Sequence, residues 1–65
     1  SVLYKFAEAY HAVNDIKSIL KQTAQNPIIS TDKKHKKAVS QMFDKCNKIQ
    51  KMIELCGGDL DDLIP

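Results

Sequence analysis

The chain has 65 residues, of which 43% are hydrophobic and 28% charged, and its formal net charge is +2. This length allows one small domain that buries only ~60% of its unfolded surface and is marginally stable alone, and the composition argues against intrinsic disorder. No apolar run reaches the ~18 residues of a membrane span, and the scarcity of Gly and Pro favours long helices over a turn-rich β fold.

Residues 2–25 are predicted to form the first helix, because apolar residues recur at alternating steps of four and three. This stripe consists of Val2, Phe6, Ala9, Val13, Ile16, Leu20 and Thr23. It is widened on its flanks by Leu3, Tyr10, Ala12 and Ile19. So broad a face indicates more than one neighbouring helix, as in a three- or four-helix bundle, and Leu3, Tyr10 and Ile19 are therefore candidate partner-binding residues. His11 has no metal ligand at suitable spacing, so we expect it at the surface.

A loop at about residues 26–31 is expected next. Pro27 disfavours helical geometry at the residue before it, so the first helix should end there. Ser30, Thr31 and Asp32 are three consecutive N-cap residue types. The apolar pair at residues 28 and 29 is expected to fold over the end of the core, with exposure as a docking knob as the alternative.

Residues 32–56 are predicted to form the second helix, whose stripe has steps of three and four: Val39, Met42, Cys46, Ile49, Ile53 and Cys56. The flanking Phe43 and Met52 are further candidate partner-binding residues. Both cysteines lie on the stripe, too far apart on one helix for a disulfide. We expect two buried, reduced thiols, with pairing between two chains as the alternative.

The two stripes are expected to face each other in an antiparallel hairpin, and two registers fit. The first is centred on Pro27, pairs Val13 with Met42, and is preferred because it matches the proposed turn. The second is centred near Thr31 and pairs Val13 with Ile49.

Four lysines cluster at the start of the second helix: Lys33, Lys34, Lys36 and Lys37. Cations at a helix N-terminus oppose the helix dipole, so the cluster suggests binding to a polyanion such as nucleic acid or an anionic lipid surface. The chain contains no Arg, and no aromatic residue interrupts the cluster, which weakens specific nucleic-acid recognition. The other interpretation is a solvated helix start.

Residues 57–65 form an acidic tail after Gly57 and Gly58, which should stop the helix. Apolar residues recur in the tail at steps of three and one, which suggests a short helical turn that folds back over the hairpin or docks on a partner. Leu60 and Leu63 are therefore also candidate partner-binding residues.

The sequence thus predicts a single all-α domain, a two-helix antiparallel hairpin with a short C-terminal turn or third helix, which completes a bundle by self-association. Catalytic, cofactor and metal signatures are absent, and no stretch matches a family motif. The leading interpretation is a non-catalytic protein–protein interaction or oligomerisation module, a fragment of a larger protein because it begins at Ser1, in the cytoplasm or nucleus. Polyanion binding through the four lysines is the alternative, and it predicts affinity that falls steeply with salt.

Overall fold

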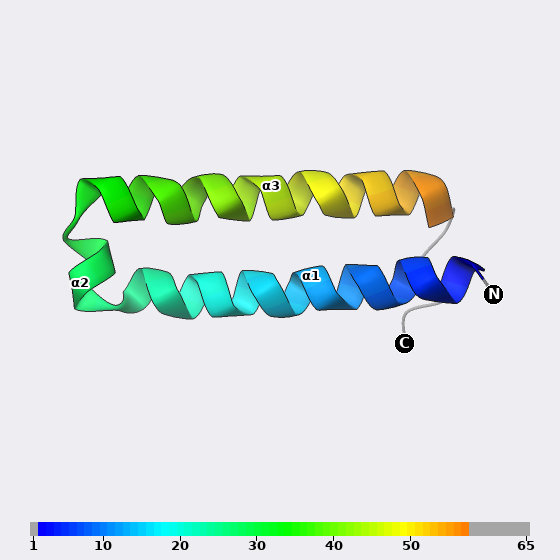
Figure 1. The fold of residues 1–65 in the computed structure, drawn as a ribbon, viewed down its shortest axis with the longest axis horizontal. Helices are drawn as coiled ribbons and strands as arrows, with labels where there is room; N and C mark the ends of the chain where they lie inside the picture. Colours follow the sequence, from blue (N-terminus) through cyan, green and yellow to red (C-terminus); the bar gives the residue numbers. More distant parts are fainter. Residues whose placement is uncertain (1, 58–65) are drawn as a thin grey trace.

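The computed structural model describes residues 2–57, which form two long antiparallel helices joined by a short one (Figure 1). Helix α1 spans Val2–Gln25, α2 spans Pro27–Ser30 and α3 spans Lys33–Gly57. The described residues contain no β-strand. Within residues 2–57, the prediction of an all-helical fold whose two long helices pack against each other is confirmed.

The connection differs from the expected loop because it contains α2. Asn26 has the extended geometry expected before a proline (φ −64°, ψ 129°), which ends α1. Its side-chain oxygen then accepts a hydrogen bond from the backbone N–H of Ile28 at 2.9 Å, and Pro27 occupies the first turn of α2, where it needs no N–H partner. In this short helix Ile28 is exposed, whereas Ile29 is half-buried.

Asp32 begins α3. One carboxylate oxygen accepts the backbone N–H of Lys34 at 3.0 Å, and the Asp32 carbonyl accepts the N–H of Lys36 at 2.9 Å. The carboxylate also pairs with the ring of His35. The hydrogen bond from Lys34 and the neighbouring His35 hold the pKa of the Asp32 carboxyl below its usual value of 3.8.

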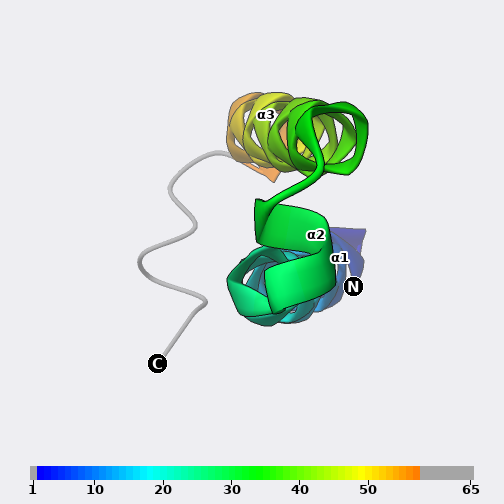
Figure 2. The same cartoon turned by 90° about the vertical axis from the view of Figure 1, so that its left-hand side faces the viewer.

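The core lies along the seam between α1 and α3. Its buried apolar residues are Ala7, Val13, Val39, Cys46 and Ile53. Phe6, Tyr10 and Leu20 are half-buried and pack against the cluster of Val13, Cys46 and Ile53. Viewed end-on, α1 and α3 lie one above the other as a single pair of helices (Figure 2). Within the described region no large side chain is fully buried, as expected for two helices that cover each other on one side only.

The expectation that the two stripes face each other across the hairpin is wrong for part of each stripe. Ile16, Met42 and Ile49 are 48%, 45% and 47% exposed. Cys56 is also exposed, so only Cys46 of the two cysteines is the buried thiol that was expected, although both are free. Each helix is rotated so that only one row of its stripe faces the neighbouring helix.

A different row of residues completes the seam. Gln50 and Gly57 are buried, while Tyr10, Lys17 and Phe43 are half-buried. Their side chains include amides, amines and rings that hydrogen-bond or stack across the seam. These interactions favour the rotation that places them between the helices.

The register centred on Pro27 is wrong, and contacts across the seam follow the one centred near Thr31. Asn14 hydrogen-bonds Gln50, and the amine of Lys17 lies over the ring of Phe43. Because α2 lengthens the connection, the residue on which the hairpin register is centred moves from Pro27 toward the start of α3.

Candidate interaction surface

A hydrogen-bonded cluster around Gln50 lies on one side of the seam. The Gln50 amide nitrogen donates to the Asn14 side-chain oxygen at 2.8 Å and to the backbone carbonyl of Tyr10 at 3.3 Å. Its amide oxygen accepts from the Lys17 amine at 3.0 Å, and the Tyr10 hydroxyl donates to Glu54 at 3.4 Å. Both ends of the buried amide are therefore satisfied, which fixes how α1 and α3 are rotated and aligned. We call this side of the hairpin the polar side.

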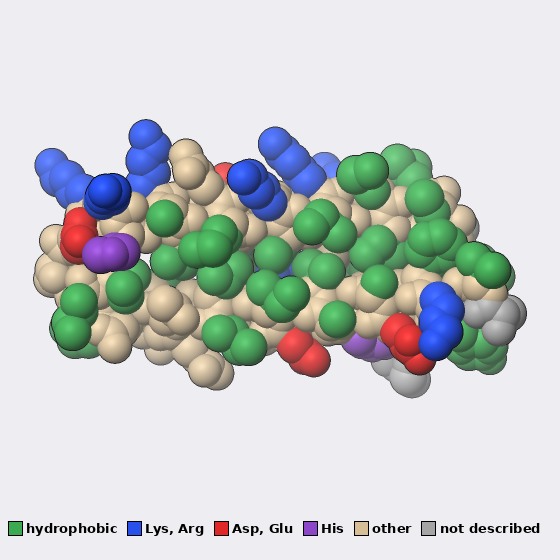
Figure 3. All heavy atoms as spheres, viewed as in Figure 1, with side chains coloured by type: hydrophobic (Ala, Val, Ile, Leu, Met, Phe, Trp, Pro, Cys, Tyr) green, Lys and Arg blue, Asp and Glu red, His purple; other side chains and the backbone are tan. Residues whose placement is uncertain are grey.

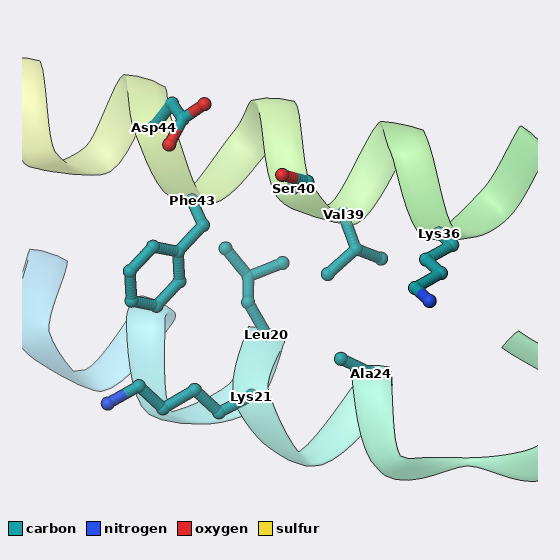
Figure 4. A pocket seen from close by; sticks show the side chains of 8 residues that line it. All are labelled: Leu20, Lys21, Ala24, Lys36, Val39, Ser40, Phe43 and Asp44. Carbon is teal, nitrogen blue, oxygen red and sulfur yellow. The ribbon is translucent and has the colours of Figure 1, made fainter. Parts of the chain in front are cut away.

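Phe43 continues the polar side toward the connection. The amines of Lys17 and Lys21 lie 5.2 and 5.6 Å from the centre of its ring, within cation–π range. Next to the ring is a shallow pocket of about 270 Å³, in which Leu20 lies beside Phe43 and Ala24 lies opposite Val39 (Figure 4).

The other side of the seam is apolar. Ile16, Met42 and Ile49 directly precede Lys17, Phe43 and Gln50, and one residue corresponds to a rotation of ~100° about the helix axis. Because α1 and α3 are antiparallel, a step back along either helix turns toward the same side of the hairpin. We call this side the open face, and its apolar residues, all exposed, are Val2, Ala9, Ala12, Ile16, Ile19, Ala38, Met42, Ile49, Met52 and Cys56.

The open face extends along most of the hairpin. Figure 3 shows hydrophobic side chains over both long helices, with lysines along the outer edge of α3. By the same helical spacing, the polar residues on this face are Lys5, Thr23, His35 and Lys45. Three of them lie toward its two ends, so its middle is apolar apart from Lys45 at the edge. A contiguous apolar surface of this kind is typical of an interaction site.

The predicted partner-binding residues lie in three environments. Ile19 and Met52 are on the open face and are 61% and 65% exposed. Tyr10 and Phe43 are instead half-buried in the seam, on the polar side. Leu3 is 44% exposed at the beginning of α1. The structure therefore brings Ile19 and Met52 into one surface and uses Tyr10 and Phe43 within the hairpin.

Leu60 and Leu63, the last two predicted partner-binding residues, lie outside the described residues. The predicted polyanion-binding residues are all exposed within the first five residues of α3: Lys33, Lys34, Lys36 and Lys37. Because they are nearly consecutive, their side chains leave the helix in several directions instead of forming one basic face.

Sequence reasoning missed the structural role of Gln50. The sequence analysis assigns it no role, because its side chain is polar and it is not part of the apolar stripe. A seven-residue spacing in the sequence could have indicated this role. Phe43, Gln50 and Gly57 recur every seven residues, beside the row of Val39, Cys46 and Ile53 on the same helix. Lys17, which is also polar, was likewise not predicted to lie in the seam.

The described residues offer little chemistry beyond packing. They contain no group of three or more His, Cys, Asp or Glu side chains that could hold a metal ion. None of the helices between residues 2 and 57 is both long and apolar enough to cross a membrane. No protein-family model, curated protein or solved structure gives a significant match to this chain. Function must therefore be inferred from the hairpin itself.

Proposed function

We propose that this chain is a non-catalytic protein–protein interaction module whose open face is covered by helices of a partner. The observation that carries the proposal is how the structure divides the two apolar stripes. Their inner rows are in the seam: Phe6, Val13 and Leu20 with Val39, Cys46 and Ile53. Their outer rows are exposed on the open face: Val2, Ala9 and Ile16 with Met42, Ile49 and Cys56.

This division is the one expected for half of a four-helix bundle. In such a bundle each helix has two neighbours at roughly right angles, and its stripe points between them toward the bundle axis. One row then contacts the first neighbour and the other row contacts the second. In the hairpin α1 and α3 are each other's first neighbour, and the outer rows have no neighbour among the described residues.

The apolar surface that a partner could bury on the open face corresponds to binding of moderate affinity. Ile16, Ile19, Met42, Ile49 and Met52 are each 45–65% exposed, so burying what remains of them contributes roughly 4–8 kcal/mol. A partner with a similar surface contributes about as much again. Association costs ~4–15 kcal/mol, so we expect affinities nearer micromolar than nanomolar.

Polyanion binding by the lysine cluster stays a prediction, and no contact of the described residues favours it over solvation. A catalytic role has less support, because the residues around the pocket beside Phe43 include no nucleophile with a hydrogen-bonded base.

The test compares Ile49→Lys with a matched control, Leu55→Lys. Each substitution replaces an exposed apolar side chain of α3 with lysine. Ile49 lies on the open face, whereas Leu55 is 85% exposed and points away from it. We expect Ile49→Lys to abolish association, measured as solution mass for the chain alone and by pull-down with the immobilised chain. Leu55→Lys should leave it unchanged, and circular dichroism verifies that both variants remain helical.

Two results would contradict the proposed function. One is a wild-type chain that is monomeric in solution and that captures, in the pull-down, the same proteins as Ile49→Lys and Leu55→Lys do. The other is an association that Leu55→Lys weakens as much as Ile49→Lys does, because the bound surface would then not be the open face.

A further inference from the structure

We propose that the partner on the open face is a second copy of this chain, placed so that α1 of each copy packs antiparallel on α3 of the other. The two-fold axis then runs parallel to the long helices, and both α2 connections lie at the same end of the dimer. This inference rests on the proposed function and specifies its partner and geometry.

The outer rows of the two helices fit each other in this arrangement. Lys17 lies beside Phe43 and Asn14 beside Gln50, which sets the levels along the hairpin. Ile16 is consequently level with the gap between Met42 and Ile49. An axis parallel to the helices preserves these levels, so Ile16 of one copy enters the gap in the outer row of the other copy's α3, as in knobs-into-holes packing.

Charge at the edges of the open face favours this pairing of α1 with α3. The outer edge of α1 carries two acids, Asp15 and Glu8, of which Glu8 pairs with Lys5 of the same helix, whereas that of α3 carries Lys34, Lys45 and Lys48. Asp15 is level with the turn of α3 that holds Lys45. In the proposed dimer the Lys45 stem lies across the partner's Ala12 and Ile19, and its amine reaches the partner's Asp15.

The reverse arrangement, with the two α2 connections at opposite ends, is disfavoured by the same residues. There α3 packs on the α3 of the other copy, about an axis through the middle of the helix. Lys45 lies at this midpoint of Lys33–Gly57, so its amine would approach the amine of its own symmetry mate. Like charges that face each other across an interface disfavour association.

The size of the open face meets the requirement for a stable dimer. The described hairpin is 18 Å across, and the 24 residues of α1 extend about 36 Å, which gives a footprint of roughly 650 Å² per copy. Two copies bury about 1,300 Å² in total, near the lower end of the usual 1,200–2,000 Å² for specific interfaces.

The first measurement is sedimentation equilibrium of the full chain from micromolar to millimolar concentration at physiological salt. The proposal expects a monomer–dimer equilibrium that Ile49→Lys abolishes and Leu55→Lys does not. A chain that is monomeric throughout this range overturns the second-copy proposal. If that monomer still captures a protein that Ile49→Lys loses, the proposed function stands without this inference.

The second measurement tests the geometry with charge reversals. Asp15→Lys and Lys45→Asp should each raise the dimer dissociation constant about tenfold, because the pair occurs twice and attraction becomes repulsion at both sites. The double variant should restore dimerisation to near the wild-type value. Asp44→Lys and Lys51→Asp make the same charge changes away from the open face and should alter the constant less than about twofold.

Zero-length carbodiimide coupling supplies a direct readout. In a mixture of isotope-labelled and unlabelled chains, we expect a cross-linked Asp15–Lys45 peptide of mixed isotope content. A dimer that neither single reversal weakens, and that gives no such mixed peptide, overturns the proposed geometry.

Discussion

Replacing Gln50 with alanine and with leucine separates what its hydrogen bonds contribute from what its burial contributes. Gln50 is 5% exposed and is the buried polar residue of the described region. Both substitutions remove its three hydrogen bonds, with Lys17, Asn14 and the Tyr10 carbonyl. Only leucine refills the space.

The magnitudes follow from these contacts. Two neutral hydrogen bonds contribute ~0.5–1.5 kcal/mol each and the one from the lysine amine about 1.5–3 kcal/mol, but the partners reach water and recover part of this. We therefore expect Gln50→Ala to lower the free energy of unfolding by about 2–4 kcal/mol, including the void it leaves. Leucine adds ~1.5–3 kcal/mol of apolar burial, so Gln50→Leu should stay within about 1 kcal/mol of wild type.

Gln50→Leu should nevertheless lose structural uniqueness. Without the amide, no buried polar contact in the described residues fixes the rotation of α3 against α1. Amide cross-peaks in an NMR spectrum should broaden or double, although urea unfolding at fixed protein concentration shows near-native stability. Gln41, an exposed glutamine of the same helix, supplies the control: Gln41→Ala and Gln41→Leu should change neither measurement.

Two results would refute this reasoning. If Gln50→Ala unfolds within about 0.5 kcal/mol of wild type, Gln50 is not buried between the helices in solution. If Gln50→Leu loses as much stability as Gln50→Ala, burial of the side chain contributes nothing and the seam is not packed as described.

Two further predictions concern the ends of α3 and its thiols. Because the pKa of Asp32 is lowered in the folded chain, the contribution of its carboxylate to stability is present above the unfolded value of 3.8 and is lost as the pH falls through the folded pKa. The NMR shift of the Lys34 amide, which donates to this carboxylate, should report the loss. The variant Asp32→Asn caps the helix without titrating and should not show it. An identical acid response in both proteins would contradict the capping role. Cys56 is exposed in the single hairpin and Cys46 is buried, so in a solution dilute enough to be monomeric a thiol reagent should modify Cys56 rapidly and Cys46 only when the hairpin opens. Equal rates in the folded monomer would show that the seam is not closed.

Secondary structure was predictable because it depends on local signals. The alternating steps of three and four define both long helices, and Pro27 ends the first of them. The short helix α2 was missed because a proline followed by two β-branched residues resembles a loop. Its stability comes from the Asn26 and Thr31 caps, which only the three-dimensional arrangement reveals.

The interaction surface was only partly predictable. The sequence correctly suggested that the apolar faces are wider than one neighbour can cover, and it identified Ile19 and Met52 as outward-facing. It also assigned Tyr10 and Phe43 to a partner, because an aromatic residue on the flank of a stripe looks the same whether it faces another chain or the second helix of its own hairpin.

The sequence by itself determined that two amphipathic helices exist, where they begin and end within a few residues, and that each carries an apolar stripe. Only the tertiary structure decided how each helix turns about its own axis, and therefore which half of each stripe is covered. The physical reason is that periodicity specifies the direction of a stripe, whereas rotation depends on contacts between helices, here the hydrogen bonds of Gln50 to Lys17, Asn14 and Tyr10.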